Sequence, residues 1–321
     1  MFNTTGATIR GDINIKVEEA AAADKFFVAQ RVLPMISVGL KSGGYPKLTR
    51  SATELLTPNS TIRNPKSEYA RTQRAWTSDT YDCVDRGLEE PVDDAESQDI
   101  GRFFNAEVAT ARFVLRAMML DYEIRVQQTL FNATNFGAAT AAAVAYTMAN
   151  IATINFPKDI LDAVERVNDN GAQANTIVMS STILNRLKQS TLLQNFIRGN
   201  RPNDSALNIT AGDIQSAFAD NGIENVFIGR ARYNSAKKGQ NYSAASVWGT
   251  GFIWVGEVQG GPADAGGAGR TFVWNDHGSG LFVTETYRED KIRSNIVRVR
   301  QNTAEKIVDG SAGTLINPNW A

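Results

Sequence analysis

The longest regular pattern of apolar residues runs from Glu96 to about Ala133. Apolar side chains recur there at steps of three and four, the spacing of one helix face, at Phe104, Val108, Ala111, Leu115, Met119, Tyr122, Val126 and Leu130. Thirty-eight residues without a proline would span about 57 Å. We predict a spine helix to which separate lobes attach. A coiled coil is the alternative, disfavoured because the apolar face is widened by Phe103, Phe113, Val114 and Ile124.

The segment before this helix, Gly43 to Pro91, is extended, polar and poor in apolar clusters. Short stretches between its turn formers could pair as a two-stranded ribbon, with residues 69–85 as the returning strand. Ordering one residue costs about 1–2 kcal/mol of backbone entropy, which buried surface normally offsets. We therefore expect a neighbouring chain to supply that surface, which would make the protein part of an assembly.

Charges are segregated within this segment. Between residues 47 and 74 the only acidic residues are Glu54 and Glu68, and the basic ones are Lys47, Arg50, Arg63, Lys66, Arg71 and Arg74. Between residues 79 and 99 the only basic residue is Arg86, and the acidic ones are Asp79, Asp82, Asp85, Glu89, Glu90, Asp93, Asp94, Glu96 and Asp99. One interpretation is two solvated runs. The other is an inter-subunit interface over residues 47–94, in which the basic tip of one subunit lies on the acidic base of the next, because opposite potentials steer docking.

The remaining patterns predict a mixed α+β protein. Residues 1–42 form an arm with a helix from Val17 to Arg31 that ends at Pro34. Helices at residues 158–168, 182–189 and 211–219 and strands at 176–180 and 226–229 predict a compact α/β lobe. Two of these helices stop at Asn-Gly pairs, because glycine adopts the left-handed conformation that closes a helix. Strands are expected at residues 246–258, 270–274 and 280–308, and the last should return to pack beside the spine.

Composition narrows the chemistry without supplying a catalytic site. The formal net charge of −1 over 321 residues disfavours a protein whose whole surface wraps nucleic acid. Cys83 and His277 are the only cysteine and histidine, so an intrachain disulfide and a Cys/His zinc site are excluded, and both residues are interpreted as structural. The polar N-terminus and the lack of a long apolar stretch predict a protein that is made in the cytoplasm and does not enter a membrane.

Two segments superficially suggest catalysis. The glycine-rich loop from Gly260 to Gly269 could be a phosphate cradle, but a strand follows it where a nucleotide site needs a helix. Asp276-His277-Gly278-Ser279 places acid, base and hydroxyl side by side, which adjacent residues cannot arrange as a triad, so we interpret it as a turn. We predict no catalytic residue, cofactor site or metal site, and no enzyme.

The order of arm, extended loop, spine helix, α/β lobe and late return strand resembles the major capsid proteins of tailed bacteriophages, which have the Hong Kong phage fold. The most family-like local sequence runs from Ala217 to Ala231 and continues at Ile253-Trp254-Val255. The resemblance implies an arm at residues 1–42, an extended loop at 43–91, a peripheral domain at 92–154 with the spine at 96–133, an axial domain at 155–275, and a return to the peripheral domain and the C-terminus at 276–321.

The resemblance also implies a function and a set of partners. Copies of the chain would form hexamers and pentamers of an icosahedral shell, assembled in the host cytoplasm, that encloses double-stranded DNA and contacts it weakly. A scaffolding protein, a portal and a decoration protein are the implied partners. Some relatives crosslink a loop lysine to an asparagine, and Lys47 or Lys66 would lie on that loop, but no partner residue is identifiable. The alternatives are an encapsulin-like compartment with enzyme cargo and a soluble α/β enzyme that uses a nucleotide at residues 260–269.

Overall fold

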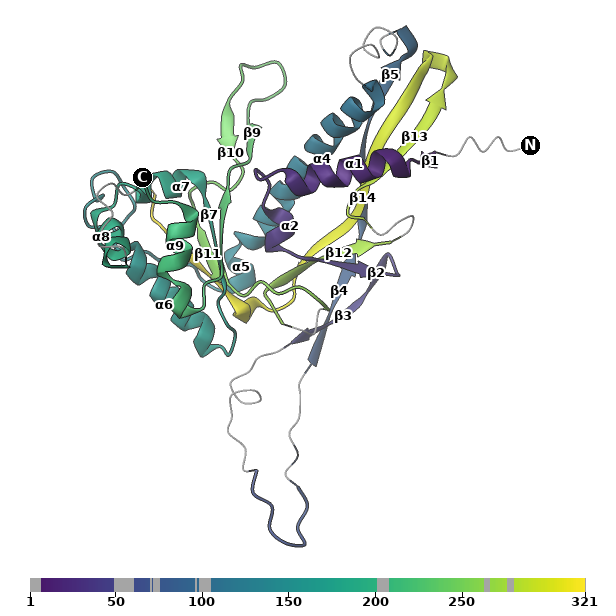
Figure 1. The fold of residues 1–321 in the computed structure, drawn as a ribbon. Helices are drawn as coiled ribbons and strands as arrows, with labels where there is room; N and C mark the ends of the chain where they lie inside the picture. Colours follow the sequence, from purple (N-terminus) through teal and green to yellow (C-terminus); the bar gives the residue numbers. More distant parts are fainter. Residues whose placement is uncertain are drawn as a thin grey trace.

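The computed structural model describes residues 7–48, 61–69, 71, 76–95, 97, 105–200, 208–262, 266–275 and 280–320. Figure 1 shows two lobes that meet at the lower end of helix α4, and a ribbon that extends away from both. Helices and strands alternate with neither dominating the chain, so the predicted α+β class is confirmed.

The first lobe is built on a sheet of six strands around one long strand, β14 (Ser294–Ile307). The strand order is β1-β13-β14-β12-β2. β5 lies off this order and pairs antiparallel with β14. Their bounds are β1 (Thr8–Ile9), β2 (Met35–Val38), β5 (Val84–Asp93), β12 (Gly269–Trp274) and β13 (Val283–Glu289). Residues 84–91, which were predicted as the last part of the extended loop, thus pair within this sheet.

Helix α4 (Ala106–Leu130) packs on this sheet and is the predicted spine, although shorter than expected. It begins where the Asn105 side chain accepts a hydrogen bond from the backbone N–H of Val108, 3.1 Å away. The late return strand does lie beside it, because Arg125 of α4 pairs with Glu305 of β14 at 3.1 Å. Its 25 residues span about 38 Å, so the predicted start at Glu96 and end near Ala133 are wrong. Phe103 and Phe104 lie outside the described residues.

The arm crosses α4 as two helices, α1 (Gly11–Ala23) and α2 (Ala29–Val32), instead of the single predicted helix from Val17 to Arg31. The break is at Asp24, whose backbone is extended and whose carboxylate accepts a hydrogen bond from the N–H of Phe26 at 2.9 Å. Ile13, Val17 and Ala21 recur at four-residue steps on α1 and are buried. The arm is therefore packed into the first lobe.

The second lobe is a five-stranded sheet covered by helices. Its order is β6-β15-β11-β7-β8, with bounds β6 (Thr140–Ala141), β7 (Thr176–Ser180), β8 (Asn225–Gly229), β11 (Ile253–Gly256) and β15 (Gly313–Asn317). The helices are α6 (Phe156–Asp169), α7 (Ser181–Leu187), α8 (Thr191–Asn200), α9 (Ala211–Ala217) and the short η1 (Ala219–Asn221). The predicted α/β lobe is confirmed, with Gly171 and Gly222 at positive φ beside the two helix stops.

The predicted domain limits remain a prediction. The pairing of strands shows which segments contribute to the sheet of the second lobe. β6 and β15 come from segments that lie on either side of the predicted axial domain, and both belong to the second sheet. Three further short helices and a small hairpin also belong to the described chain: α5 (Ala133–Phe136), η3 (Asp290–Ile292), η4 (Gly310–Ala312), and strands β9 (Arg232–Asn234) and β10 (Ala244–Ser246).

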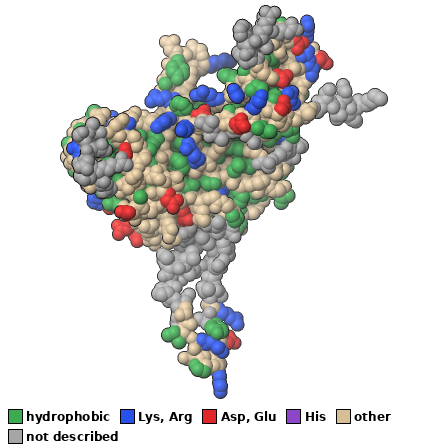
Figure 2. Space-filling model, in the orientation of Figure 1, with side chains coloured by type: hydrophobic (Ala, Val, Ile, Leu, Met, Phe, Trp, Pro, Cys, Tyr) green, Lys and Arg blue, Asp and Glu red, His purple; other side chains and the backbone are tan. Residues whose placement is uncertain are grey.

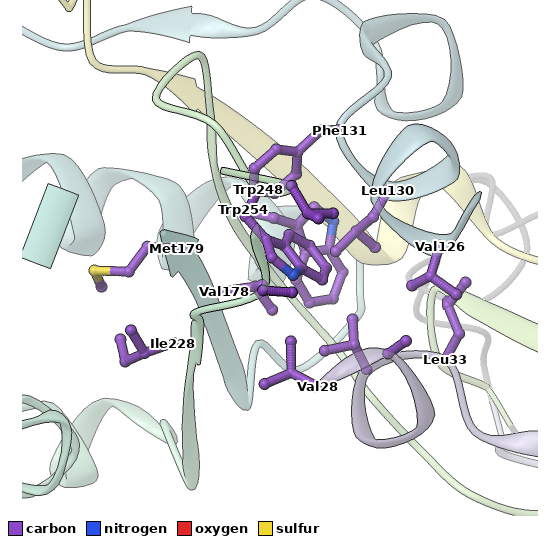
Figure 3. Packing of buried hydrophobic residues seen from close by; sticks show 14 of the residues in the cluster. Val28, Leu33, Val126, Leu130, Phe131, Val178, Met179, Ile228, Trp248 and Trp254 are labelled. Atoms are coloured by element: carbon purple, nitrogen blue, oxygen red, sulfur yellow. The ribbon is translucent and has the colours of Figure 1, made fainter. Parts of the chain in front are cut away.

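One apolar cluster runs through both lobes. Figure 3 shows Val28 and Leu33 of the arm beside Val126 and Leu130 of α4, with Trp248 and Trp254 of the second lobe close by. Both tryptophans are fully buried, and Phe131 meets Trp248 edge to face at 5.2 Å between ring centroids. The lobes therefore share a hydrophobic core at the end of the spine helix.

Candidate inter-subunit surfaces

The base of the ribbon is fixed to the first sheet by aromatic residues. Phe272 of β12 contacts two tyrosines, Tyr81 stacked at 4.7 Å and Tyr45 tilted at 5.0 Å between ring centroids. Cys83 is buried beside them, and its thiol donates to the carbonyl oxygen of Phe272 at 3.6 Å. Burial raises the pKa of this thiol, so Cys83 is a packed structural residue, as interpreted from the sequence.

From this base the chain extends as the predicted ribbon, in which β3 (Ser42–Leu48) is antiparallel to β4 (Trp76–Asp82). The Tyr45 hydroxyl is 3.3 Å from both Asp79 and the carbonyl oxygen of Ile307, which ties the ribbon to β14. Lys47 lies 4.0 Å from the same carboxylate. A hydrogen bond from the N–H of Thr80, together with Tyr45 and Lys47, lowers the pKa of Asp79. Two candidate contact residues thus pair within one chain.

The far end of the ribbon carries the basic residues. All described residues at 61–69 and 71 are exposed, and Figure 2 shows this tip well separated from the body. Asn64 to Ser67 form a turn with Lys66 at φ 68°, and the Arg63 guanidinium lies 4.8 Å above the Tyr69 ring. Arg71 is 87% exposed and pairs loosely with Glu68 at 3.6 Å. Arg50 and Arg74 lie outside the described residues.

The described part of the acidic run, from Asp79 to Asp94, lies on β4, on β5 and directly after β5, at the opposite end of the ribbon from the tip (Figure 1). Glu96 and Asp99 lie outside the described residues. Exposed acidic side chains along it are Asp82, Asp85, Glu89 and Asp93, and Glu90 is half-buried. Glu89 accepts a hydrogen bond from the Tyr287 hydroxyl at 3.1 Å, whereas Asp94 makes a two-point ion pair with Arg288 at 2.6 and 2.7 Å. That pair lowers the pKa of Asp94. Asp94 is therefore engaged within its own chain.

Comparison with known proteins agrees with this geometry. The chain is 25% identical over 228 residues to the major capsid protein of Pseudomonas phage JBD67, which covers 69% of each protein. A phage-related protein of Bordetella bronchiseptica has the same fold, with a TM-score of 0.72, 18% identity and 98% coverage of both chains. A structure of Mycobacterium phage Cain matches with a TM-score of 0.55, 13% identity and coverage of 94% and 93%.

The chain has the major capsid protein fold of tailed bacteriophages. The structural likeness establishes this Hong Kong phage fold, and the sequence likeness to a phage protein supports a capsid shell protein. The SrpI encapsulin of Synechococcus elongatus shares the fold, with a TM-score of 0.53, 9% identity and coverage of 90% and 85%. No protein-family model matches the chain.

One buried carboxylate of this capsid fold escaped sequence reasoning. Glu123 of α4 is fully buried and accepts hydrogen bonds from the N–H groups of Val28 and Ala29 and from the Trp248 indole at 2.6 Å. It joins the arm, the spine and the second lobe at one point. Burial outweighs these hydrogen bonds and raises the pKa of Glu123.

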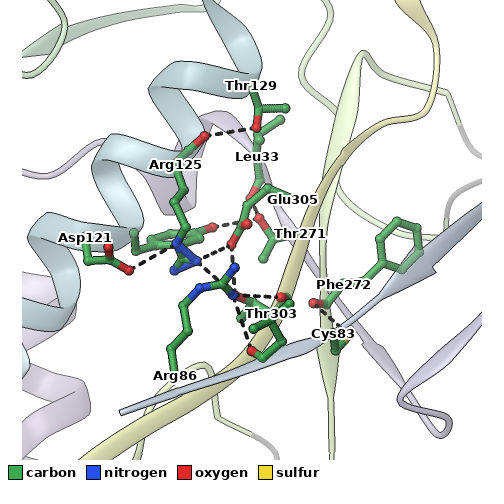
Figure 4. A network of polar contacts seen from close by, with 12 residues as sticks. Leu33, Cys83, Arg86, Asp121, Arg125, Thr129, Thr271, Phe272, Thr303 and Glu305 are labelled. Atoms are coloured by element: carbon green, nitrogen blue, oxygen red, sulfur yellow. Dashed lines mark hydrogen bonds and ion pairs between the residues drawn. The ribbon is translucent and has the colours of Figure 1, made fainter. Parts of the chain in front are cut away.

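A second polar network links the spine to the sheet (Figure 4). Arg125 contacts Glu305 at 3.1 Å and Asp121 at 3.1 Å, while Arg86 of β5 donates to the carbonyl oxygen of Thr303 at 3.2 Å. The Tyr122 hydroxyl lies 2.7 Å from Thr271. The capsid fold thus holds its spine helix on the sheet through polar contacts as well as apolar ones.

The described part of the glycine-rich loop differs from a phosphate cradle. Arg270 is fully buried and donates to the carbonyl oxygens of Gly261, Gly266 and Gly269 at 3.2, 2.6 and 2.9 Å. These carbonyls face a cation of the same chain, whereas a phosphate site presents N–H groups. The Asp276 to Ser279 segment, with His277, lies outside the described residues.

The described residues contain no cluster of three or more His, Cys, Asp or Glu residues that could hold a metal ion. None of the helices among them combines the length and the apolar character needed to cross a bilayer.

Proposed function

We propose that this protein is the major capsid protein of a tailed bacteriophage and that its copies assemble into hexamers and pentamers of an icosahedral shell around double-stranded DNA. The observation that carries the proposal is the ribbon, whose base is buried against Phe272 and whose described tip residues are all exposed. An ordered tip of this kind needs a neighbouring surface to offset its entropy cost. The fold and the likeness to a phage capsid protein support the same function.

The contact we propose joins the tip of one subunit to β5 of the next. Arg63, Lys66 and Arg71 are exposed at the tip, and Asp85 and Glu89 are exposed on β5. Single exposed ion pairs contribute about 0–1 kcal/mol, so several together would set register more than affinity. Such contacts weaken with salt, because screening shortens the reach of exposed charges.

A shell function would require partner proteins and a place of assembly. A closed shell that holds a genome needs a portal for entry, and a scaffolding protein would guide its curvature, while a decoration protein could bind its outer surface. Assembly would take place in the host cytoplasm, and the mature protein would lie in the virion. DNA contact would be weak and non-specific, in keeping with the formal net charge of −1.

The test is electron microscopy of the purified assembled protein, together with analysis of nuclease-protected nucleic acid. Closed shells built from six- and five-fold capsomers, filled with protected double-stranded DNA when produced during infection, are the expected result. Protein that stays monomeric under all assembly conditions would contradict the proposal.

An encapsulin-like compartment is the second candidate, favoured by the likeness to the SrpI encapsulin. The two functions share a fold and differ in their contents. Small shells that co-purify with one enzyme and protect no DNA would establish the compartment instead of the virion.

A further inference from the structure

A groove lies where the arm, the spine helix and the second lobe meet. Its volume is about 450 Å³, and its walls come from the connection between α1 and α2, the outer face of α4 and the residues around the start of β9. The lining residues are Phe26, Phe27, Phe113, Arg116, Ala117, Leu120, Arg230, Ala231 and Arg232. None of the residues that were predicted as inter-subunit contacts belongs to it.

The rim of the groove is strongly basic. Arg116, Arg230 and Arg232 are exposed and contribute three guanidinium groups, while the described lining residues include no carboxylate. Among the described residues, no acidic side chain forms an ion pair with any of these three arginines. On the face drawn in Figure 2, Lys and Arg side chains gather between the β9–β10 hairpin and α4.

The floor of the groove is apolar and open. Phe113 is 66% exposed and Phe26 is 52% exposed, and the half-buried Ala117 and Leu120 line the same groove. Large aromatic side chains held in a concave site are typical of sites that receive apolar side chains of a partner. Arginines around such a site favour carboxylates, which they bind with two parallel hydrogen bonds.

We propose that this groove binds an acidic amphipathic helix of a separate protein, with leucine or phenylalanine side chains on the floor and glutamate or aspartate side chains against the arginines. Duplex DNA fits less well. Its phosphates could pair with the arginines of the rim, but its backbone has no apolar group that would cover the exposed phenylalanines. The exposed acidic run of a neighbouring copy is already the proposed partner of the ribbon tip. Helix-in-groove recognition is the mode that these features match.

The experiment uses the purified full chain at dilution, so it does not depend on shell assembly. Fluorescence anisotropy would measure binding of a synthetic helical peptide with leucines at helical spacing and glutamates beside them. A peptide of the same composition, scrambled to break that spacing, is the control probe. Two competing probes are a peptide of residues 84–94 of this chain and a short duplex DNA.

Two variants test the site and one controls for charge. Arg230→Glu/Arg232→Glu and Phe113→Ser should each weaken binding of the helical peptide by about tenfold or more. Lys237→Glu/Lys238→Glu makes the same change in net charge on exposed residues between β9 and β10 and should leave binding unchanged. Circular dichroism checks that each variant is folded, which is expected because all five substituted residues are exposed.

The outcomes separate the possible occupants. Binding of the helical peptide with the expected variant pattern supports the proposal. Absence of binding, equal binding of the scrambled peptide, or equal weakening in the Lys237→Glu/Lys238→Glu control overturns it. Tighter binding of duplex DNA at the same arginines would make the groove a DNA contact, and tighter binding of the 84–94 peptide would make it an interface between copies, and either result also overturns it.

Discussion

Single buried residues decide how the arm, the spine and the second lobe meet, and Glu123 is the clearest of them. Its neighbours Tyr122 and Val126 follow the apolar period and were predicted to be buried, and they are. Glu123 is buried as well because its hydrogen-bond donors belong to residues 28, 29 and 248, far away in the sequence. A periodic pattern records the helix face and contains no information on such distant donors.

Replacing Glu123 by Gln tests this carboxylate. Gln has one oxygen that can accept where the carboxyl group has two, so one of the three N–H donors loses its partner and the free energy of unfolding should fall by about 1–3 kcal/mol. Burial raises the pKa of Glu123 above 4.5, so the folded state binds its proton more tightly than the unfolded chain does. The wild-type contribution is therefore complete below pH 4.5 and shrinks as pH rises through the raised pKa.

The measurement is urea denaturation of both proteins across a pH series. The difference in unfolding free energy between wild type and Glu123→Gln should decrease as the pH rises. A difference that grows with pH would mean that the fold stabilises the ionised carboxylate.

Gly229 at the end of β8 is the second residue-scale test. An added Cβ would overlap the Trp248 ring, which is fully buried and cannot move aside without disturbing the shared core. Gly229→Ala should lower stability by about 1–3 kcal/mol or more, as over-packed cores do. Thermal denaturation would measure this loss. Gly251→Ala is the matched control, because nothing lies within 4 Å of the new methyl group, and an equal loss there would contradict the explanation.

At the scale of elements, local signals predicted the second lobe well and the spine less well. The strand at Thr176–Ser180 has the predicted bounds, because a short run of β-formers is delimited by an Asn-Gly stop before it and a serine cap after it. The spine begins later than predicted, because Asn105 has an extended backbone and its side chain caps the first turn of the helix. Ten consecutive residues of β5 pair with β14, about two hundred positions later in the chain. The charge pattern of residues 84–93 does not predict that pairing.

The attachment of the ribbon depends on one aromatic ring. Phe272→Ala would remove the ring that contacts Tyr45 and Tyr81 and should lower the free energy of unfolding by about 3–5 kcal/mol. The β3–β4 ribbon should also be cleaved faster by a protease, because its base is no longer packed. Phe113→Ala is the control, since that side chain is 66% exposed and should change stability by less than about 0.5 kcal/mol. Unchanged proteolysis of the ribbon in Phe272→Ala would refute the role of this ring.

At the scale of the whole molecule, the sequence predicted the extended ribbon and the segregation of its charges. The groove at the junction of the lobes was not predictable, because its rim combines arginines from α4 and from the start of β9 with phenylalanines of the arm. The charge hypothesis now has defined geometry, with Arg63 and Arg71 exposed at the tip and Asp85 and Glu89 exposed on β5. The pairing itself remains a prediction.

Charge reversal tests that pairing. Arg63→Glu/Arg71→Glu should leave the protomer folded, because both residues are exposed, and should impair shell assembly. Adding Asp85→Lys/Glu89→Lys should restore assembly by exchanging the two charges. Light scattering would follow assembly at low and high salt, and the defect should diminish as salt screens the repulsion. Normal shells from the first variant, or no rescue by the second, would argue against this contact.

The most direct measurement is hydrogen exchange of the backbone amides at residues 61–69, compared between dilute protomers and assembled particles. If a neighbouring subunit completes each protomer, these amides should exchange rapidly in the protomer and become strongly protected in the particle. Protection already present in dilute protomers, or rapid exchange that persists after assembly, would contradict the account.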